Sequence, residues 1–159
     1  MPCYKILKRQ VRDVTHDLLK AKYYVEECDY TCAIIKGQDI FTSTDRGVLP
    51  LLKLIDAGKS ASGFSAADRV LGRGSAFLYI ILGVTEIYAK VISLGAIELL
   101  KKNGITIYFK RSVRTVMNRR ADGPCPIESA LEGVEDPKIA VEVIKNTLQK
   151  LKGEENENS

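Results

Sequence analysis

The feature that most constrains the fold is a stretch near the middle of the chain, where a helical pattern separates two strand-like segments. Residues 86–92 are rich in β-branched and aromatic side chains, which is typical of a strand. Ser93 follows as a helix N-cap, and the pair Asn103-Gly104 supplies a helix end. Residues 105–109 then predict a second strand. Because such a unit forms a right-handed crossover, the two strands should be parallel.

Hydrophobic periodicity predicts further elements on both sides of this unit. In chain order they are a helix over 11–27, a hairpin of strands over 32–36 and 39–43, helices over 51–57 and 65–82, a helix or turn over 112–118, and helices over 126–131 and from 137 onward. The helix over 65–82 begins at Ser65 as its cap, and its second half is apolar on all sides, so it should lie at the centre of the domain. This order predicts an α/β fold in which a mixed sheet of at least four strands lies between helical layers.

The chain length of 159 residues corresponds to one domain. We expect a basic leader over 1–10, the domain over 11–152, and a disordered acidic tail over 153–159. The longest apolar run is far shorter than the roughly 20 residues that span a bilayer, and the N-terminus lacks the pattern of a secretory signal. We therefore expect a cytoplasmic protein without a membrane partner.

The cysteines do not form a metal-binding pattern. The four of them include no Cys-x-x-Cys pair, and the single histidine, His16, lies far from Cys125 in the sequence. We expect reduced thiols, no metal and no cofactor.

Basic residues are concentrated between 101 and 120, where seven lysines and arginines occur without any acid. This density favours an anionic partner, either a nucleotide-like or phosphorylated small molecule or a nucleic acid. A solvated basic face is the alternative. The sequence also leaves open whether the protein forms a homo-oligomer.

Two residues near the start of the predicted central helix are candidates for a site. Asp68 is a candidate catalytic carboxylate, although its position three residues after Ser65 equally suits a capping box. Arg69 would share a helix face with Arg73 beside Gly72 and Gly74. Glycines within a helix indicate a close approach, either by a ligand or by tight helix packing.

Cys125 is the sharpest candidate for chemistry. Pro126 suits the first position of a helix, which places Cys125 at the cap, where free N–H groups and the nearby Arg119 and Arg120 favour a thiolate. Such a thiol would be a nucleophile. Glu128, at the third helical position, would cap the backbone or orient a ligand. The candidate ligand-binding residues are Arg46, Arg69, Asn118, Arg119, Asp122 and Glu128.

Several motifs occur in an order that resembles a known family. They are Arg46-Gly47-Val48 with Pro50-Leu51-Leu52, Ala67-Asp68-Arg69-Val70-Leu71-Gly72, Ile92-Ser93 with Ala96-Ile97-Glu98-Leu99-Leu100, and Asn118-Arg119 with Asp122-Gly123 and Cys125-Pro126. From about residue 30 to about residue 150 the chain is similar to the family called domain of unknown function 1893. The resemblance implies a cytidine-deaminase-like three-layer α/β/α sandwich, and it implies no established activity.

Deaminases of that fold bind zinc through two motifs. A His-Ala-Glu or Cys-Ala-Glu starts the helix before the third strand, and a Pro-Cys-x-x-Cys starts the helix after that strand. At the first place we expect Ala66-Ala67-Asp68 here, and at the second Ile92-Ser93-Leu94-Gly95-Ala96, neither of which offers such ligands. Pro124-Cys125-Pro126 follows a later strand and lacks the second cysteine. The resemblance therefore implies a domain without the zinc ligands, and zinc-dependent deamination is not expected.

The sequence thus predicts a domain that binds a nucleotide-like or phosphorylated small molecule in a cleft near Cys125. A thiol-dependent enzyme using Cys125 and a nucleic-acid-binding module using residues 101–120 are the two alternatives.

Overall fold

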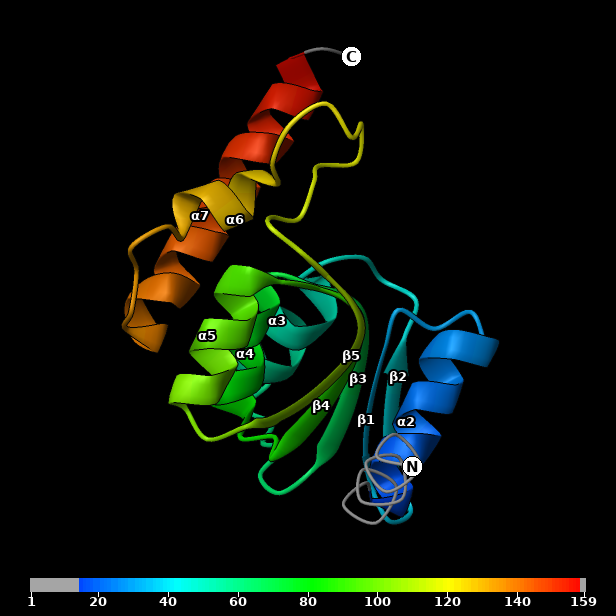
Figure 1. The fold of residues 1–159 in the computed structure, drawn as a ribbon. Helices are drawn as coiled ribbons and strands as arrows, with labels where there is room; N and C mark the ends of the chain where they lie inside the picture. Colours follow the sequence, from blue (N-terminus) through cyan, green and yellow to red (C-terminus); the bar gives the residue numbers. More distant parts are fainter. Residues whose placement is uncertain (1–14, 158–159) are drawn as a thin grey trace.

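The computed structural model describes residues 15–157 and contains one mixed sheet of five strands (Figure 1). The strands are β1 (Cys32–Lys36), β2 (Asp39–Ser43), β3 (Ser65–Leu71), β4 (Glu86–Ser93) and β5 (Thr106–Val113), in the spatial order β2-β1-β3-β4-β5. β1 is antiparallel to both of its neighbours, whereas β3, β4 and β5 are parallel to one another. The predicted mixed α/β sheet is therefore confirmed.

Helices cover both faces of this sheet (Figure 1). On one face lies α2 (His16–Glu27), which packs on β1, β3 and β4. The other face carries α3 (Leu49–Asp56), α4 (Arg73–Leu82) and α5 (Leu94–Lys102). The short helix α6 (Pro126–Ala130) and the long helix α7 (Pro137–Glu157) pack against the outer side of α4. Within the described residues no helix is long and apolar enough to span a membrane.

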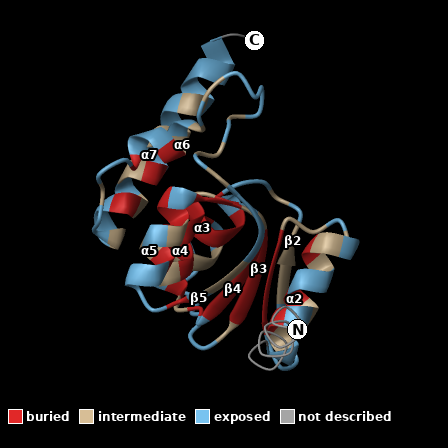
Figure 2. Ribbon diagram, viewed as in Figure 1, coloured by how far each residue is buried: buried red, intermediate tan, exposed pale blue. Residues whose placement is uncertain are grey.

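Buried residues are concentrated in the central strands and in α4 (Figure 2). The larger apolar cluster joins α3, α4 and α5 to the sheet and includes Phe77 and Leu78, which are almost completely buried. A smaller cluster, with Leu18 and Val25, joins α2 to the opposite face. The apolar half of the predicted central helix therefore does lie at the centre of the domain.

The central strand–helix–strand unit forms as predicted. The Ser93 hydroxyl accepts a hydrogen bond from the backbone N–H of Ala96 at 3.2 Å, which caps α5. β4 and β5 on either side of α5 are parallel. The hairpin β1–β2 also has the predicted bounds.

The helix predicted over 65–82 is wrong in its first half. Residues Ser65–Leu71 form strand β3, and the helix α4 begins only at Arg73, after the extended residue Gly72. Ala66 and Ala67 are fully buried because the strand lies between β1 and β4 with both faces covered. A strand buried on both faces shows no polar–apolar alternation, so its small residues resembled a helix start.

Two other predictions differ from the structure. Residues 112–118 are not helical, because β5 continues to Val113 and the chain then runs to a bridge between Met117 and Pro124. The last helix continues through Gly153 to Glu157, where we expected a disordered tail; one glycine in a helix costs only about 1 kcal/mol. The predicted leader over 1–10 and the first residues of the predicted helix over 11–27 lie outside the described residues.

Candidate functional site

Most of the candidate residues belong to segments at the carboxyl ends of the parallel strands. The start of β1 and the segment after β2 adjoin the end of β3, because β1 runs antiparallel to both β2 and β3. In open α/β sheets, ligands bind outside the carboxyl ends of the strands, where the direction of the connections changes. These ends of the strands are therefore where a ligand is expected, and they are called the carboxyl edge of the sheet.

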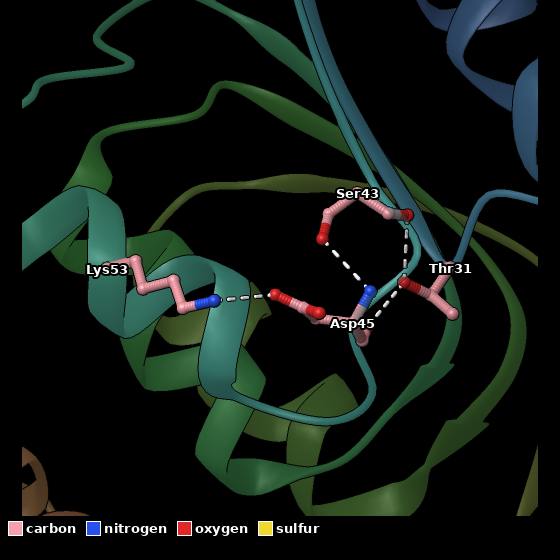
Figure 3. Close-up of polar contacts among 4 residues, drawn as sticks. All are labelled: Thr31, Ser43, Asp45 and Lys53. Atoms are coloured by element: carbon pink, nitrogen blue, oxygen red, sulfur yellow. Dashed lines mark hydrogen bonds and ion pairs between the residues drawn. The ribbon is translucent and has the colours of Figure 1, made fainter.

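A hydrogen-bond network fixes the segment that carries Arg46 (Figure 3). The Thr31 hydroxyl donates to the backbone carbonyl oxygens of Ser43, at 3.0 Å, and of Asp45. The Asp45 N–H donates to the Ser43 hydroxyl at 3.0 Å, and the Asp45 carboxylate pairs with Lys53 at 2.8 Å. Asp45 is thus paired with a lysine of α3. Arg46 is exposed and forms no ion pair among the described residues.

Asp68 lies in β3, so the interpretation of Asp68 as a helix-capping residue is wrong. Its side chain is only 6% exposed. It accepts hydrogen bonds from the Tyr79 hydroxyl at 2.8 Å and from the Val70 N–H at 3.2 Å. Burial raises the pKa of Asp68 to about 7, against the opposing effects of the Tyr79 hydrogen bond and of Arg69. A group with such a pKa exchanges its proton near neutral pH.

Two buried groups beside Asp68 were not identified as site residues from the sequence. Cys32 is the cross-strand partner of Asp68 on β1, and burial, reinforced by the charges of Asp68 and Asp45, raises its thiol pKa. Burial also raises the pKa of the Tyr79 hydroxyl. The available signal was the hydroxyl of Tyr79 in an otherwise apolar helix, because a buried hydroxyl requires a partner.

Arg69 and Arg73 do not share a helix face, because Arg69 is in β3 and Arg73 starts α4. The guanidinium of Arg69 donates to the backbone carbonyl oxygen of Tyr30 at 3.2 Å. The two glycines near them mark close packing. A Cβ added to Gly72 would lie 2.7 Å from Oε2 of Glu128, and one added to Gly74 would meet the Ile127 side chain at 2.8 Å. Of the two explanations, tight packing, here by α6, is the one observed.

Glu128 caps a helix, but not its own. Its Oε2 accepts a hydrogen bond from the Arg73 N–H at 2.6 Å, so the carboxylate lies at the N-terminus of α4. The side chain is 6% exposed. A negative charge at a helix N-terminus is favourable because free N–H groups point toward it. Its role is therefore at least structural.

Asn118 and Asp122 close a loop that carries Arg119. The Asn118 amide donates to the Asp122 carboxylate at 2.7 Å, and the Asp122 N–H donates back to the Asn118 side-chain oxygen at 3.3 Å. Arg119 is exposed between them. Cys125 is half-buried at the N-cap of α6, and its backbone N–H donates to the carbonyl oxygen of Val116 at 2.8 Å.

The structure does not join all of these residues into one cluster. Asp68 lies beneath α4, whereas Cys125 lies at the start of α6, and no hydrogen bond between residues 15 and 157 links the two side chains. His16 is at the start of α2, on the other face of the sheet, so it is not a base for Cys125. In the same range no three His, Cys, Asp or Glu residues are grouped to hold a metal ion.

The structure shows which helix starts correspond in position to the two zinc motifs. The third strand is β3, so the helix before it is α3, which starts at Val48-Leu49-Pro50 rather than at the expected Ala66-Ala67-Asp68. The helix after β3 is α4, which starts at Gly72-Arg73-Gly74-Ser75 rather than at the expected Ile92-Ser93-Leu94-Gly95-Ala96. Neither start carries a histidine, cysteine or glutamate.

The fold and these helix starts define a mixed-sheet α/β/α domain whose helix starts lack the deaminase zinc motifs. The chain belongs to the family described as TM1506, domain of unknown function (DUF1893), which it matches over residues 20–148. A crystal structure of a DUF1893 family protein (TM1506) from Thermotoga maritima is similar, with a TM-score of 0.74 and 27% identity over 86% of this chain and 92% of that chain.

A dCMP deaminase from the cyanophage S-TIM5 in apo form aligns with a TM-score of 0.39 and 12% identity, over 61% of this chain and 94% of that chain. No curated protein matches the sequence.

Proposed function

We propose that this domain binds a small nucleotide-like or phosphorylated molecule at the carboxyl edge of its sheet. The observation that carries the proposal is that three separate segments each bring one arginine to the carboxyl end of a strand. Arg46 follows β2, Arg69 is in β3, and Arg119 is in the loop after β5. None of the three has an ion-pair partner within residues 15–157.

Arginine suits this ligand class because its planar guanidinium binds phosphate oxygens through two parallel hydrogen bonds. The segment around Arg46 is held by the contacts of Thr31 and Lys53, and the loop around Arg119 is closed by the Asn118–Asp122 hydrogen bonds. Fixed supports lower the entropic cost of ordering these side chains around a ligand. The Asn118 and Asp122 side chains supply the amide and carboxylate groups that pair with base edges.

A nucleic acid is the second candidate, and one observation favours it. Lys110, Arg111 and Arg114 are exposed on and just after the edge strand β5. Phe109 beside them is 46% exposed and offers a stacking face. Binding to these residues would depend steeply on salt, because phosphate contacts release counterions.

Thermal unfolding in the presence of mononucleotides tests the proposal. A ligand at 100 times its Kd stabilises the native state by about 2.7 kcal/mol. For a domain of this size that corresponds to a rise in Tm of roughly 5–10 °C. The Arg46→Ala and Arg119→Ala variants should lose most of this rise. Lys101→Ala is the matched control. Lys101 is exposed near the end of α5, just before β5 begins, so it lies toward the amino ends of the parallel strands.

Two results would contradict the proposal: no Tm rise with any mononucleotide or with inorganic phosphate, or an equal loss in all three variants. Tight, strongly salt-dependent binding of oligonucleotides in place of mononucleotides would favour the nucleic-acid candidate. Cys125→Ser should retain mononucleotide binding, since the thiol is not needed for charge recognition. If an activity were found and this variant abolished it, the thiol-dependent enzyme would be the better description.

A further inference from the structure

A small hollow lies beside α5, away from the three arginines of the proposed edge site. Its volume is about 120 Å³, and it is lined by the start of α4, by α5 and by the connection between α6 and α7. An engineered apolar cavity of about 150 Å³ holds a benzene molecule. The hollow therefore suits an organic group of about four carbon atoms.

The lining of this hollow includes three aliphatic side chains. Leu131 is 1% exposed and belongs to the core. Leu99 of α5 and Val134 of the α6–α7 connection are half-buried and pack against the same core. An aliphatic group placed against these three side chains would be removed from water, which favours binding.

The charged residues around the hollow differ in whether they are paired. Lys102 and Glu135 form an ion pair at 3.8 Å, so these two charges already have partners. Arg73 and Glu98 also line the hollow, and neither side chain has an ion-pair partner among residues 15–157. One cation and one anion thus adjoin an apolar surface without neutralising each other.

Gly95 determines where the Arg73 side chain lies. A Cβ added to Gly95 would be 2.1 Å from Nε of Arg73 and 2.9 Å from its Cζ. The guanidinium therefore lies directly against the first turn of α5, in space that only glycine leaves open. Glu98 is one turn further along the same helix. A cation from α4 and a carboxylate from α5 thus both lie along the first two turns of α5.

We propose that this hollow binds a free α-amino acid with a short aliphatic side chain. Its carboxylate pairs with the Arg73 guanidinium, its ammonium group pairs with Glu98, and its side chain packs on Leu99, Leu131 and Val134. The zwitterion matches the two unpaired charges, whereas a simple anion would meet Glu98 and a simple cation would meet Arg73. This binding is separate from the proposed edge site, since Arg46, Arg69 and Arg119 do not line the hollow.

Titration calorimetry with L-valine tests the proposal, and two analogues test its charges. Isovalerate lacks the ammonium group and isobutylamine lacks the carboxylate, so each should bind at least about tenfold more weakly, the ratio that corresponds to 1.4 kcal/mol. Equal affinity for valine and for either analogue would overturn the zwitterion assignment. The absence of binding by valine, leucine, isoleucine and alanine would overturn the site itself.

Variants locate the binding. Arg73→Gln and Glu98→Gln should each weaken valine binding at least about tenfold. Gly95→Ala should do the same without touching a charge, because the new Cβ displaces the guanidinium. Glu142→Gln, an exposed carboxylate on α7, is the control and should bind valine like the wild type. Unchanged affinity in both Arg73→Gln and Glu98→Gln would overturn the proposal. Mononucleotide binding is measured separately, so either proposal can fail alone.

Discussion

The two faces of the sheet each place a carboxylate against a tyrosine hydroxyl, but with opposite electrostatic results. On the α4 face, Asp68 accepts from Tyr79, and burial raises its pKa to about 7. On the α2 face, Glu26 accepts from Tyr88, and its pKa is lowered, first by that hydrogen bond and then by nearby lysines against the effect of burial. A tyrosine hydroxyl thus accompanies a neutral-pH acid where burial dominates, and a carboxylate with a lowered pKa where the hydrogen bond and three lysines outweigh burial.

The largest expected effect concerns the protonation of Asp68. The pKa of Asp68 is raised from its ordinary value of 3.8 to about 7. Between these two pH values the folded protein therefore holds a proton that the unfolded chain has lost. The stability that this proton contributes is therefore fully present below about pH 3.8 and is lost as the pH rises through about 7. Since one pKa unit corresponds to about 1.4 kcal/mol, the loss amounts to as much as about 4 kcal/mol.

Denaturant unfolding between pH 4 and pH 8 measures this loss. The Asp68→Asn variant keeps a side chain of similar size without the titrating proton, so its free energy of unfolding should lack this part of the pH dependence. Asp39→Asn is the control, because Asp39 is exposed at the start of β2 and its substitution should leave the wild-type slope unchanged. Parallel curves for wild type and Asp68→Asn would show that Asp68 does not titrate in this range.

A smaller effect is expected from removing the hydroxyl above Asp68. Tyr79→Phe deletes the donor of the 2.8 Å hydrogen bond while keeping the buried ring. Near pH 8, where Asp68 is charged, we expect a loss of about 2 kcal/mol, because hydrogen bonds to charged groups contribute more than neutral ones. Near pH 5 the loss should fall to about 1 kcal/mol. Tyr23→Phe, at a tyrosine that is 58% exposed, is the control; equal losses at both pH values would contradict the prediction.

The sequence could predict β4 and α5 but not the start of β3, because the residues of β3 do not themselves favour a strand. β4 contains Ile87, Tyr88 and Val91, whose shapes favour strands whatever surrounds them. β3 begins with Ser65-Ala66-Ala67, whose intrinsic preference is a helix start, and only pairing with β1 and β4 makes it a strand. Tertiary contacts therefore override propensity in β3.

The candidate site shows the same division. Asp68 was identifiable as a carboxylate in a motif, but its environment depends on Tyr79 in the following helix and on Cys32 on another strand. Glu128 was identifiable as a capping acid, but its partner Arg73 is 55 residues away. Spacing in a sequence reports neighbours on one element, whereas these contacts arise only when separate elements pack.

The smallest effect belongs to Glu26, and its sign is opposite to that of Asp68. Because its pKa is lowered from 4.5, the stability that it contributes is present above about pH 4.5 and is lost as the pH falls below it. Glu26→Gln removes the acceptor of the Tyr88 hydroxyl in its charged form and leaves Lys22, Lys90 and Lys110 without their shared anion. The group is partly exposed, so the loss near pH 7 should stay below about 1 kcal/mol and shrink at high salt. The loss should shrink as the pH falls, because the wild-type carboxylate then becomes protonated too. A loss that grows on acidification would contradict the opposite pH dependences predicted here for the contributions of Asp68 and Glu26 to stability.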